Sequence, residues 1–279
     1  MTISKIEGKI TALEPISHIG ESRSIDSLFN REAMLITTKV GITKRIEVPI
    51  ISGNSLRGVL RRKAGYRLLE LLGLKKETLA EGLQHAFFSG GILKKGAGNG
   101  VLDTQFISKL RSNIPIISLF GSAIGQQLIQ GKLDVGQLIP ISCQTTGRTG
   151  IDSDISIYSL LDERSATRRD DMEDKTKGTQ DPDEQKQQMR YTHEVLVAGT
   201  EFYHYFTLKN CNDLEKGAFW STLTEFSKYP KIGGLGCRGF GMVRLGYTID
   251  IDSAQKYEAW VVENKEAITK YIKYLEGIA

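Results

Sequence analysis

The stretch ISGNSLRGVLRRKAGYRLLELLG, residues 51–73, carries apolar side chains at the spacing of an α-helix. They recur every three or four residues, at Leu56, Val59, Leu60, Ala64, Leu68, Leu69 and Leu72. Asn54 or Ser55 is a natural N-cap, because its side-chain oxygen can accept a hydrogen bond from an unpaired helix N–H. The pattern predicts a helix from about residue 55 to residue 72.

Other elements are placed around this helix. Alternation in the first 13 residues predicts a strand, the polar stretch 14–32 reads as a loop, and residues 33–50 read as a hairpin closed by Pro49. Further patterns predict a strand near 195–210, a helix at 213–228, a strand near 240–250 and a helix at 254–276. This order is that of a split β-α-β unit. We therefore expect an α+β, ferredoxin-like single domain spanning 1–279, with large insertions at about 73–160 and 163–190.

Residues 163–190 hold seven Lys/Arg, eight Asp/Glu and few apolar side chains. Such a composition cannot pack into a core, so this segment is expected to be a mobile insertion or a projecting arm. The adjacent Asp170 and Asp171 raise the alternative of a divalent metal, but in an arm of mixed charge they are better interpreted as solvated. The sequence therefore indicates no metal site and no cofactor.

Basic residues cluster at the start of the first helix. Seven Lys/Arg and a single acid, Glu47, lie between Lys44 and Arg67. Arg57 and Arg61 are one turn apart and share a face, and a helix N-terminus offers N–H groups to an anion. Guanidinium forks and fixed donors suit phosphate recognition. The alternative is a solvated face of a surface helix.

A glycine-rich segment, KIGGLGCRGFG, occupies residues 231–241 and has five glycines. Gly234, Gly236 and Gly239 match G-x-G-x-x-G, but a dinucleotide fingerprint follows a strand and opens a helix, whereas this one follows a helix and leads into a strand. A loop that lets the backbone approach a ligand closely fits better, with Lys231 and Arg238 as a positive rim. A plain flexible connection is the alternative.

Catalytic signals are weak. His18 has Glu14, Glu21 and Asp26 near it in sequence and is a candidate general base or RNA contact, although a histidine in a loop is most often only solvated. No histidine pair has metal-ligand spacing, and there is no nucleophile motif. We expect a cytoplasmic protein without a membrane span. The three cysteines are far apart in the sequence, no apolar run is long enough to cross a membrane, and the sequence shows no signal peptide. The net charge of +4 is consistent with a polyanionic partner.

Two motifs in order carry a resemblance. VPIISGNSLRGVLRR resembles the I-P-G-S-S-L-K-G-x-L-R signature of RAMP-superfamily CRISPR proteins, and KIGGLGCRGFGMV is similar to the glycine-rich loop of that superfamily. With LFGSA at 119–123 and SGG at 89–91, they resemble the backbone subunit of multisubunit CRISPR effector complexes, with type IV ahead of type III.

The resemblance implies an RRM-like palm, and residues 163–190, or part of them, would form the thumb or a neighbouring web. It also implies that copies of the protein stack along CRISPR RNA together with other effector subunits, and that the guide holds a target by base pairing. It implies no catalytic residue, since Asp26 does not match the type III pattern clearly. The rival functions are a CRISPR RNA-processing endoribonuclease with His18 as base, a target-cleaving type III subunit, and an unrelated ferredoxin-like interaction protein. The RNA-binding residues expected are His18, Asn54, Ser55, Arg57, Arg61, Arg62, Arg164, Arg168, Arg169, Lys231, Gly233, Gly234, Gly236 and Arg238.

Overall fold

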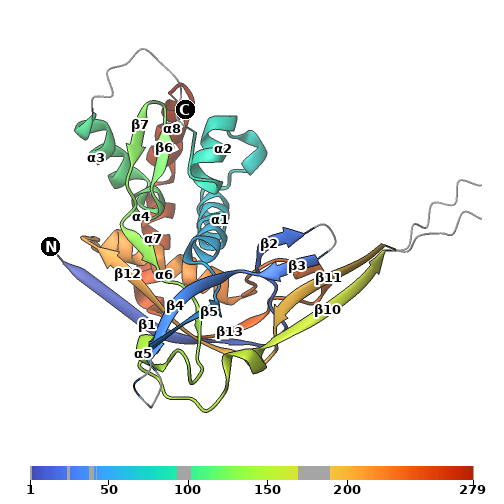
Figure 1. Ribbon diagram of the computed structural model, residues 1–279. Helices are drawn as coiled ribbons and strands as arrows, with labels where there is room; N and C mark the ends of the chain where they lie inside the picture. Colours follow the sequence, from blue (N-terminus) through green and yellow to red (C-terminus); the bar gives the residue numbers. More distant parts are fainter. Residues whose placement is uncertain are drawn as a thin grey trace, which may run out of the picture.

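An antiparallel sheet joins the two ends of the chain (Figure 1). The computed structural model describes residues 2–23, 26–37, 41, 43–92, 102–168 and 189–278. The strand order is β13 (Val243–Gly246), β1 (Ile3–Ala12), β12 (Glu201–Lys209) and β8 (Leu133–Val135), and β9 (Ile139–Pro140) also pairs with β12. Each pair is antiparallel. Among the described residues, four α-helices lie between β1 and β8, and one α-helix lies between β12 and β13. This order is that of two interleaved β-α-β units, so the split β-α-β prediction is confirmed.

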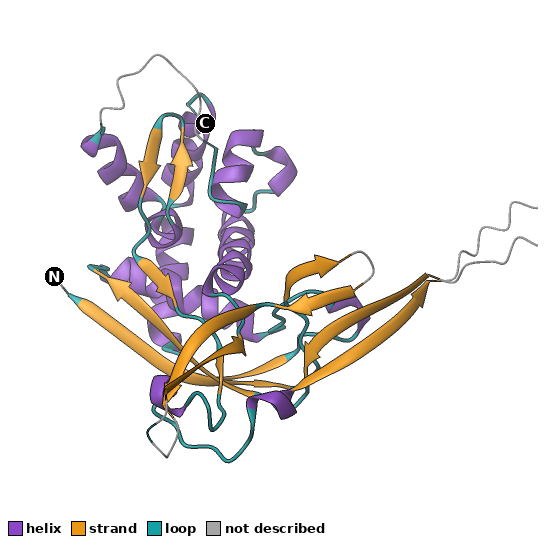
Figure 2. Cartoon of the chain, in the orientation of Figure 1, coloured by secondary structure: helices purple, strands orange, loops and turns teal. Residues whose placement is uncertain are grey.

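Helices cover one face of this sheet (Figure 2). α1 (Gly53–Leu72) packs against α6 (Asp213–Ser227), which in turn packs against α7 (Ile251–Glu263). Along β12 the side chains alternate, so Phe202, His204 and Phe206 are buried toward these helices. The Phe206 ring meets Phe219 of α6 edge to face, with centroids 5.1 Å apart.

The chain between α1 and β8 builds further helices on the same side. They are α2 (Glu81–Phe88), α3 (Thr104–Asn113) and α4 (Pro115–Phe120), followed by a hairpin of β6 (Ser122–Ile124) and β7 (Gln127–Ile129). In the described part of the chain, the other connections contain the single-turn helix α5 (Thr146–Thr149) and three short 3-10 turns, Lys76–Thr78, Ile157–Leu160 and Gly236–Arg238.

A second sheet stands beside the first. Its order is β10 (Leu161–Arg168), β11 (Met189–Leu196), β3 (Asp26–Phe29) and β2 (Ile19–Arg23). β4 (Arg31–Thr37) and β5 (Thr43–Pro49) form the expected hairpin. The prediction of a loop over 14–32 is therefore wrong, because β3 finds a parallel partner in β11, more than 160 residues later in the chain.

Two helix boundaries also differ from the sequence predictions. The terminal helix is two helices, α7 and α8 (Lys265–Glu276), separated at Asn264. The N-cap of α1 is Ser52, whose side chain accepts from the Ser55 N–H, so neither Asn54 nor Ser55 is the cap. Among the residues that the structure describes, no helix is both long and apolar enough to cross a membrane.

Candidate nucleic-acid interface

The N-terminus of α1 is fixed in place by contacts from distant parts of the chain. The Ser52 N–H donates to Nε2 of His18 at 3.2 Å, and the Ser52 hydroxyl accepts from the Ser55 N–H at 3.2 Å. Gly53 leaves no room for a side chain, because a Cβ there would clash with the carbonyl oxygen of Val135. The helix start is thus held between β8 and the segment that leads into β2.

The glycine-rich loop, residues 231–241, docks on the same segment. The Gly234 N–H donates to the Ser17 carbonyl at 2.7 Å, and the Gly241 N–H donates to the Pro15 carbonyl at 2.9 Å. Gly233 has φ +79°, and a Cβ there would clash with the Ser17 oxygen. Ser17 and His18 are adjacent, so one dipeptide holds both sequence motifs together. The sequence analysis did not single out Ser17 or Ser52.

Five of the predicted RNA-binding residues are exposed on these two motifs: Asn54, Arg62, Gly233, Gly234 and Arg238. Gly236 is half-buried, and a Cβ there would meet only Cδ of Lys231, at 3.7 Å. Ser55 is also half-buried, and its N–H is used by the Ser52 cap. The exposed side chains, the helix start and the glycine backbone are therefore the groups that this region offers to a ligand.

Lys231 does not form the expected positive rim. Its Nζ donates to the Gly236 carbonyl at 2.8 Å and lies 3.4 Å from Oε2 of Glu14, and its side chain is only 17 % exposed. A hydrogen bond to Tyr229 is the largest cause that raises the pKa of Lys231; Glu14 raises it as well, and burial opposes both. Lys231 folds inward and supports the loop, so Arg238 is the exposed cation of this segment.

Arg57 and Arg61 share a face as predicted, but that face turns inward. Each donates from a guanidinium nitrogen to the Phe120 carbonyl at 2.6 Å. Phe120 is the last residue of α4, so the two cations meet the negative end of that helix. Burial, with the charge of the neighbouring Arg57 as a smaller cause, lowers the pKa of Arg61 to about 10. The solvated-face interpretation is therefore wrong for these two arginines, and the side chains are not open phosphate forks.

His18 is half-buried rather than solvated. Its ring lies edge-on to Phe29, and burial lowers its pKa. Because Nε2 accepts the Ser52 N–H, this nitrogen has no lone pair available for a substrate proton. Asp26 lies on β3 opposite Thr192, in the sheet formed by β10, β11, β3 and β2. Within the described ranges, no group of three or more His, Cys, Asp or Glu is arranged to hold a metal ion.

The charged segment begins and ends as a two-stranded ribbon. β10 and β11 pair antiparallel from Leu161–Leu196 out to Arg168–Met189, and they run away from the helices toward the right of Figure 1. Arg164 is exposed and lies 3.1 Å from Asp162. Only the main chain of Arg168 is described, and Arg169 and the Asp170–Asp171 pair lie outside the described residues.

Comparison with known proteins agrees with this geometry. The model of the RAMP superfamily matches residues 9–244, which is most of the chain. The chain therefore belongs to the RAMP superfamily, whose ferredoxin-like core is the sheet and helices described above. Among solved structures it is similar to a chain titled "Type IV-B CRISPR Complex", with a TM-score of 0.63 and 21 % sequence identity over 88 % of this chain and 91 % of that chain. No curated protein matches the sequence.

Proposed function

We propose that this protein is a non-catalytic RNA-binding backbone subunit of a type IV CRISPR effector complex, which coats the guide RNA by repeating along it. The observation that carries the proposal is the convergence of the α1 start and the glycine-rich loop on Ser17 and His18. The similarity in fold to a chain of a type IV-B complex supports the choice of assembly. Its partners would be CRISPR RNA, further copies of itself, other subunits and a target strand.

The proposed RNA contact is a backbone contact. Helix N–H groups at the α1 start favour an anion. Two exposed guanidinium groups, Arg62 in the α1 motif and Arg238 in the glycine-rich loop, would add positive charge to the RNA contact. Gly234 and Gly236 present main chain without a side chain, so RNA could approach closely there. Phosphate contacts carry no base information, so base pairing by the guide would supply the specificity.

The ribbon of β10 and β11 is the proposed thumb. Its described part extends from the second sheet, and Arg164, Arg168 and Arg169 would contribute cations to RNA or to a neighbouring copy. Arg57 and Arg61 take a different role in this proposal. They would hold α4 against α1 and so shape the surface beside the RNA rather than touch phosphate.

Both rival activities lack geometric support. A CRISPR RNA-processing endoribonuclease needs a general base, but Nε2 of His18 is engaged by Ser52 and burial lowers the pKa of this ring. A target-cleaving subunit would use Asp26, which lies on β3 opposite Thr192 of β11, but the sequence around Asp26 does not match the type III pattern clearly. We therefore place neither residue in a catalytic role.

The deciding experiment is to purify the protein from its host, sequence the nucleic acid that travels with it, and measure protein copies per RNA. Many copies on one CRISPR RNA are expected. One copy per RNA with cut ends would favour the processing enzyme, and absence of RNA would favour an unrelated interaction protein. Loss of cleavage on His18→Ala or Asp26→Asn in a cleavage assay would restore the corresponding rival.

A further inference from the structure

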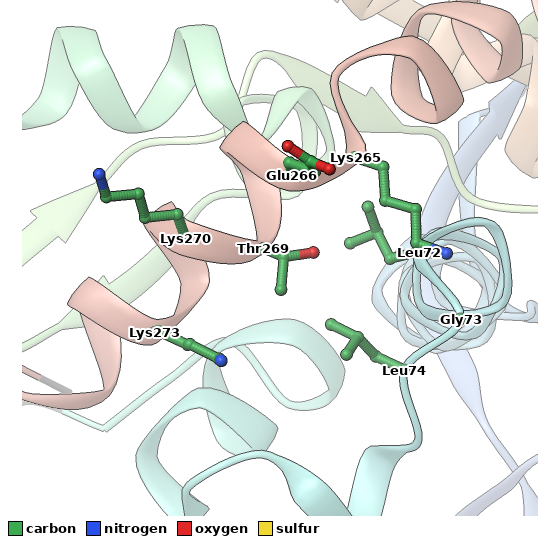
Figure 3. A pocket seen from close by; sticks show the side chains of 8 residues that line it. All are labelled: Leu72, Gly73, Leu74, Lys265, Glu266, Thr269, Lys270 and Lys273. Atoms are coloured by element: carbon green, nitrogen blue, oxygen red, sulfur yellow. The ribbon is translucent and has the colours of Figure 1, made fainter.

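A hollow of about 570 Å³ lies at the far end of α1 from the proposed RNA contact (Figure 3). Its floor is apolar, formed by Leu72 and Leu74 on either side of the α1 C-cap, Gly73. Helix α8 forms the opposite wall. The volume is many times the ~30 Å³ that one water takes in the liquid, so the hollow has room for side chains from another molecule.

The rim of this hollow is basic. Figure 3 shows Lys265 beside Gly73 and Lys273 toward Leu74, with Thr269 between them, while Lys270 extends outward from α8. All three lysines are exposed, and none has an ion-pair partner among the residues that the structure describes. Glu266 is the one carboxylate that lines the hollow. The site therefore suits an occupant with apolar side chains flanked by negative charge. We call this site the basic hollow.

The same chain carries a loop of that description. Residues 152–158, read as DSDISIY and named the acidic loop here, expose Ile155 (52 %) and Tyr158 (64 %). Asp152 and Asp154 are exposed on either side of Ser153, and neither carboxylate has a partner within the described ranges. The acidic loop is thus a projecting apolar pair beside two unpaired negative charges.

The acidic loop is held in one shape. The Cys143 N–H donates to the Ile155 carbonyl at 2.9 Å, and the Ile157 N–H donates to Oε1 of Gln144 at 2.9 Å. Ile157 is fully buried and anchors the loop, which leaves the Ile155 side chain outside. A loop that is already ordered loses little conformational entropy when it docks.

The two surfaces lie at opposite ends of the molecule. In Figure 1, α8 is in the upper part, whereas the loop between α5 and β10 runs along the lower edge. One chain cannot bring them together, but two copies stacked in the same orientation can. Contacts of this head-to-tail type repeat without closing when the rotation does not form a ring, and they generate helical filaments.

We propose that the acidic loop of one copy docks into the basic hollow of the next. Ile155 and Tyr158 would meet the Leu72–Leu74 floor, and Asp152 and Asp154 would meet the lysines of α8. This contact rests on the proposed function, since it supplies the copy-to-copy interface of an RNA coat, but it uses no residue of the proposed RNA contact.

The test uses charge reversal in the full chain. Lys270→Glu with Lys273→Glu alters the hollow, Asp152→Lys with Asp154→Lys alters the acidic loop, and one chain carries all four changes. Assembly is followed by sedimentation and electron microscopy on long RNA. Binding to an RNA long enough for a single copy is followed by anisotropy. Lys256→Glu, on an exposed face of α7 outside the hollow, is the matched control.

Each double reversal should raise the protein concentration needed for assembly at least ~10-fold at low salt, because like charges then face each other. Binding to the single-copy RNA should be unchanged, as should assembly of Lys256→Glu. The fourfold variant should assemble again, because its charges are exchanged across the contact. Rescue of this kind would not follow from damage to the fold of either surface.

Normal assembly of both double variants, or no rescue in the fourfold variant, would overturn the contact and leave the RNA-binding proposal standing. Loss of binding to the single-copy RNA in the lysine variant would show that the basic hollow binds RNA phosphates, and this result would also overturn the proposed contact between copies. If the parent protein binds no RNA, the proposed function fails instead. The contact is then read from sedimentation of concentrated protein alone, where the same reversals must weaken self-association.

Discussion

Arg61 donates a 2.6 Å hydrogen bond from its guanidinium to the carbonyl oxygen of Phe120, at the C-terminus of α4. Its side chain packs with the charged carbon 5.8 Å from the centre of the Phe120 ring. The residue is 9 % exposed, and one of its terminal nitrogens has no partner among the described residues. Arg61 therefore joins two helices, and its position in a basic sequence cluster did not reveal this.

Arg61→Ala should lower the free energy of unfolding by about 1–3 kcal/mol, because a hydrogen bond from a charged donor and its packing are lost. The change is measured by urea denaturation. RNA affinity should fall only as far as the folded fraction falls, with the salt dependence unchanged. A stable variant with a reduced salt slope would instead place Arg61 on phosphate.

Arg62→Ala should behave in the opposite way. Arg62 is exposed, so its loss should change stability by less than ~0.5 kcal/mol. If it contacts one phosphate of single-stranded RNA, the slope of log K against log salt should fall by roughly 0.7, and equally for unrelated RNA sequences. Lys109→Ala, an exposed cation on α3, is the control whose slope should not move. A changed sequence preference with an intact slope would contradict the assignment.

Gly233 and Gly236 form a matched pair within one loop. Gly233→Ala should destabilise the protein by roughly 1–3 kcal/mol, because its φ of +79° disfavours a side chain and a Cβ would clash with Ser17. At Gly236 a Cβ meets only ordinary contact distance, so Gly236→Ala should unfold at the parent temperature. If the loop backbone approaches RNA, Gly236→Val should weaken RNA binding nonetheless. Thermal melts and RNA titrations of the three variants separate the two roles.

The sequence predicted α1 and the hairpin of β4 and β5 well, because both depend on neighbours close in the chain. β3 was missed because its partner β11 is far away in sequence, and β2, which pairs with β3, was missed with it. The break at Asn264 was missed because the apolar stripe of α7 continues in α8, without a Gly or Pro between them. The local spacing of apolar residues predicts single helices and strands, but it does not predict which distant strands pair.

In the candidate site, too, the sequence predicted local features but not contacts with distant parts of the chain. The structure brings the two predicted motifs together on Ser17 and His18, whereas the directions of several of their side chains differ from the prediction. Sequence cannot state that Arg57 and Arg61 face Phe120, or that Lys231 turns to Gly236, since each partner belongs to another element or to a loop of unusual backbone. The choice of Ser52 as N-cap similarly depends on His18, 34 residues earlier.

Stability should fall in mild acid because of His204. Burial lowers the pKa of His204 to about 4, against 6.5 for an open histidine, although the Gly136 backbone raises it slightly. Because the pKa is lower in the folded protein, His204 is protonated at a higher pH in the unfolded chain than in the folded one. The stabilisation is therefore complete above pH 6.5 and is lost as pH falls toward 4, by up to roughly 3 kcal/mol. Denaturant titrations across this range should show the loss, and His204→Gln should flatten it; an equal slope in the variant would point to other groups.

Lys132 and Glu215 form the last testable pair. Glu215 is 1 % exposed, and both of its oxygens lie within 2.7 Å of Nζ of Lys132, while it also caps α6 through the Asn212 N–H. Lys132→Met would leave that carboxylate buried without its cation, which should cost about 3–5 kcal/mol by urea denaturation. Lys132→Met with Glu215→Gln removes the charge but keeps the capping oxygen. The double variant should therefore be more stable than Lys132→Met alone, although each change by itself destabilises. A double variant that loses the sum of the two single losses would show that the pair contributes through packing rather than through charge.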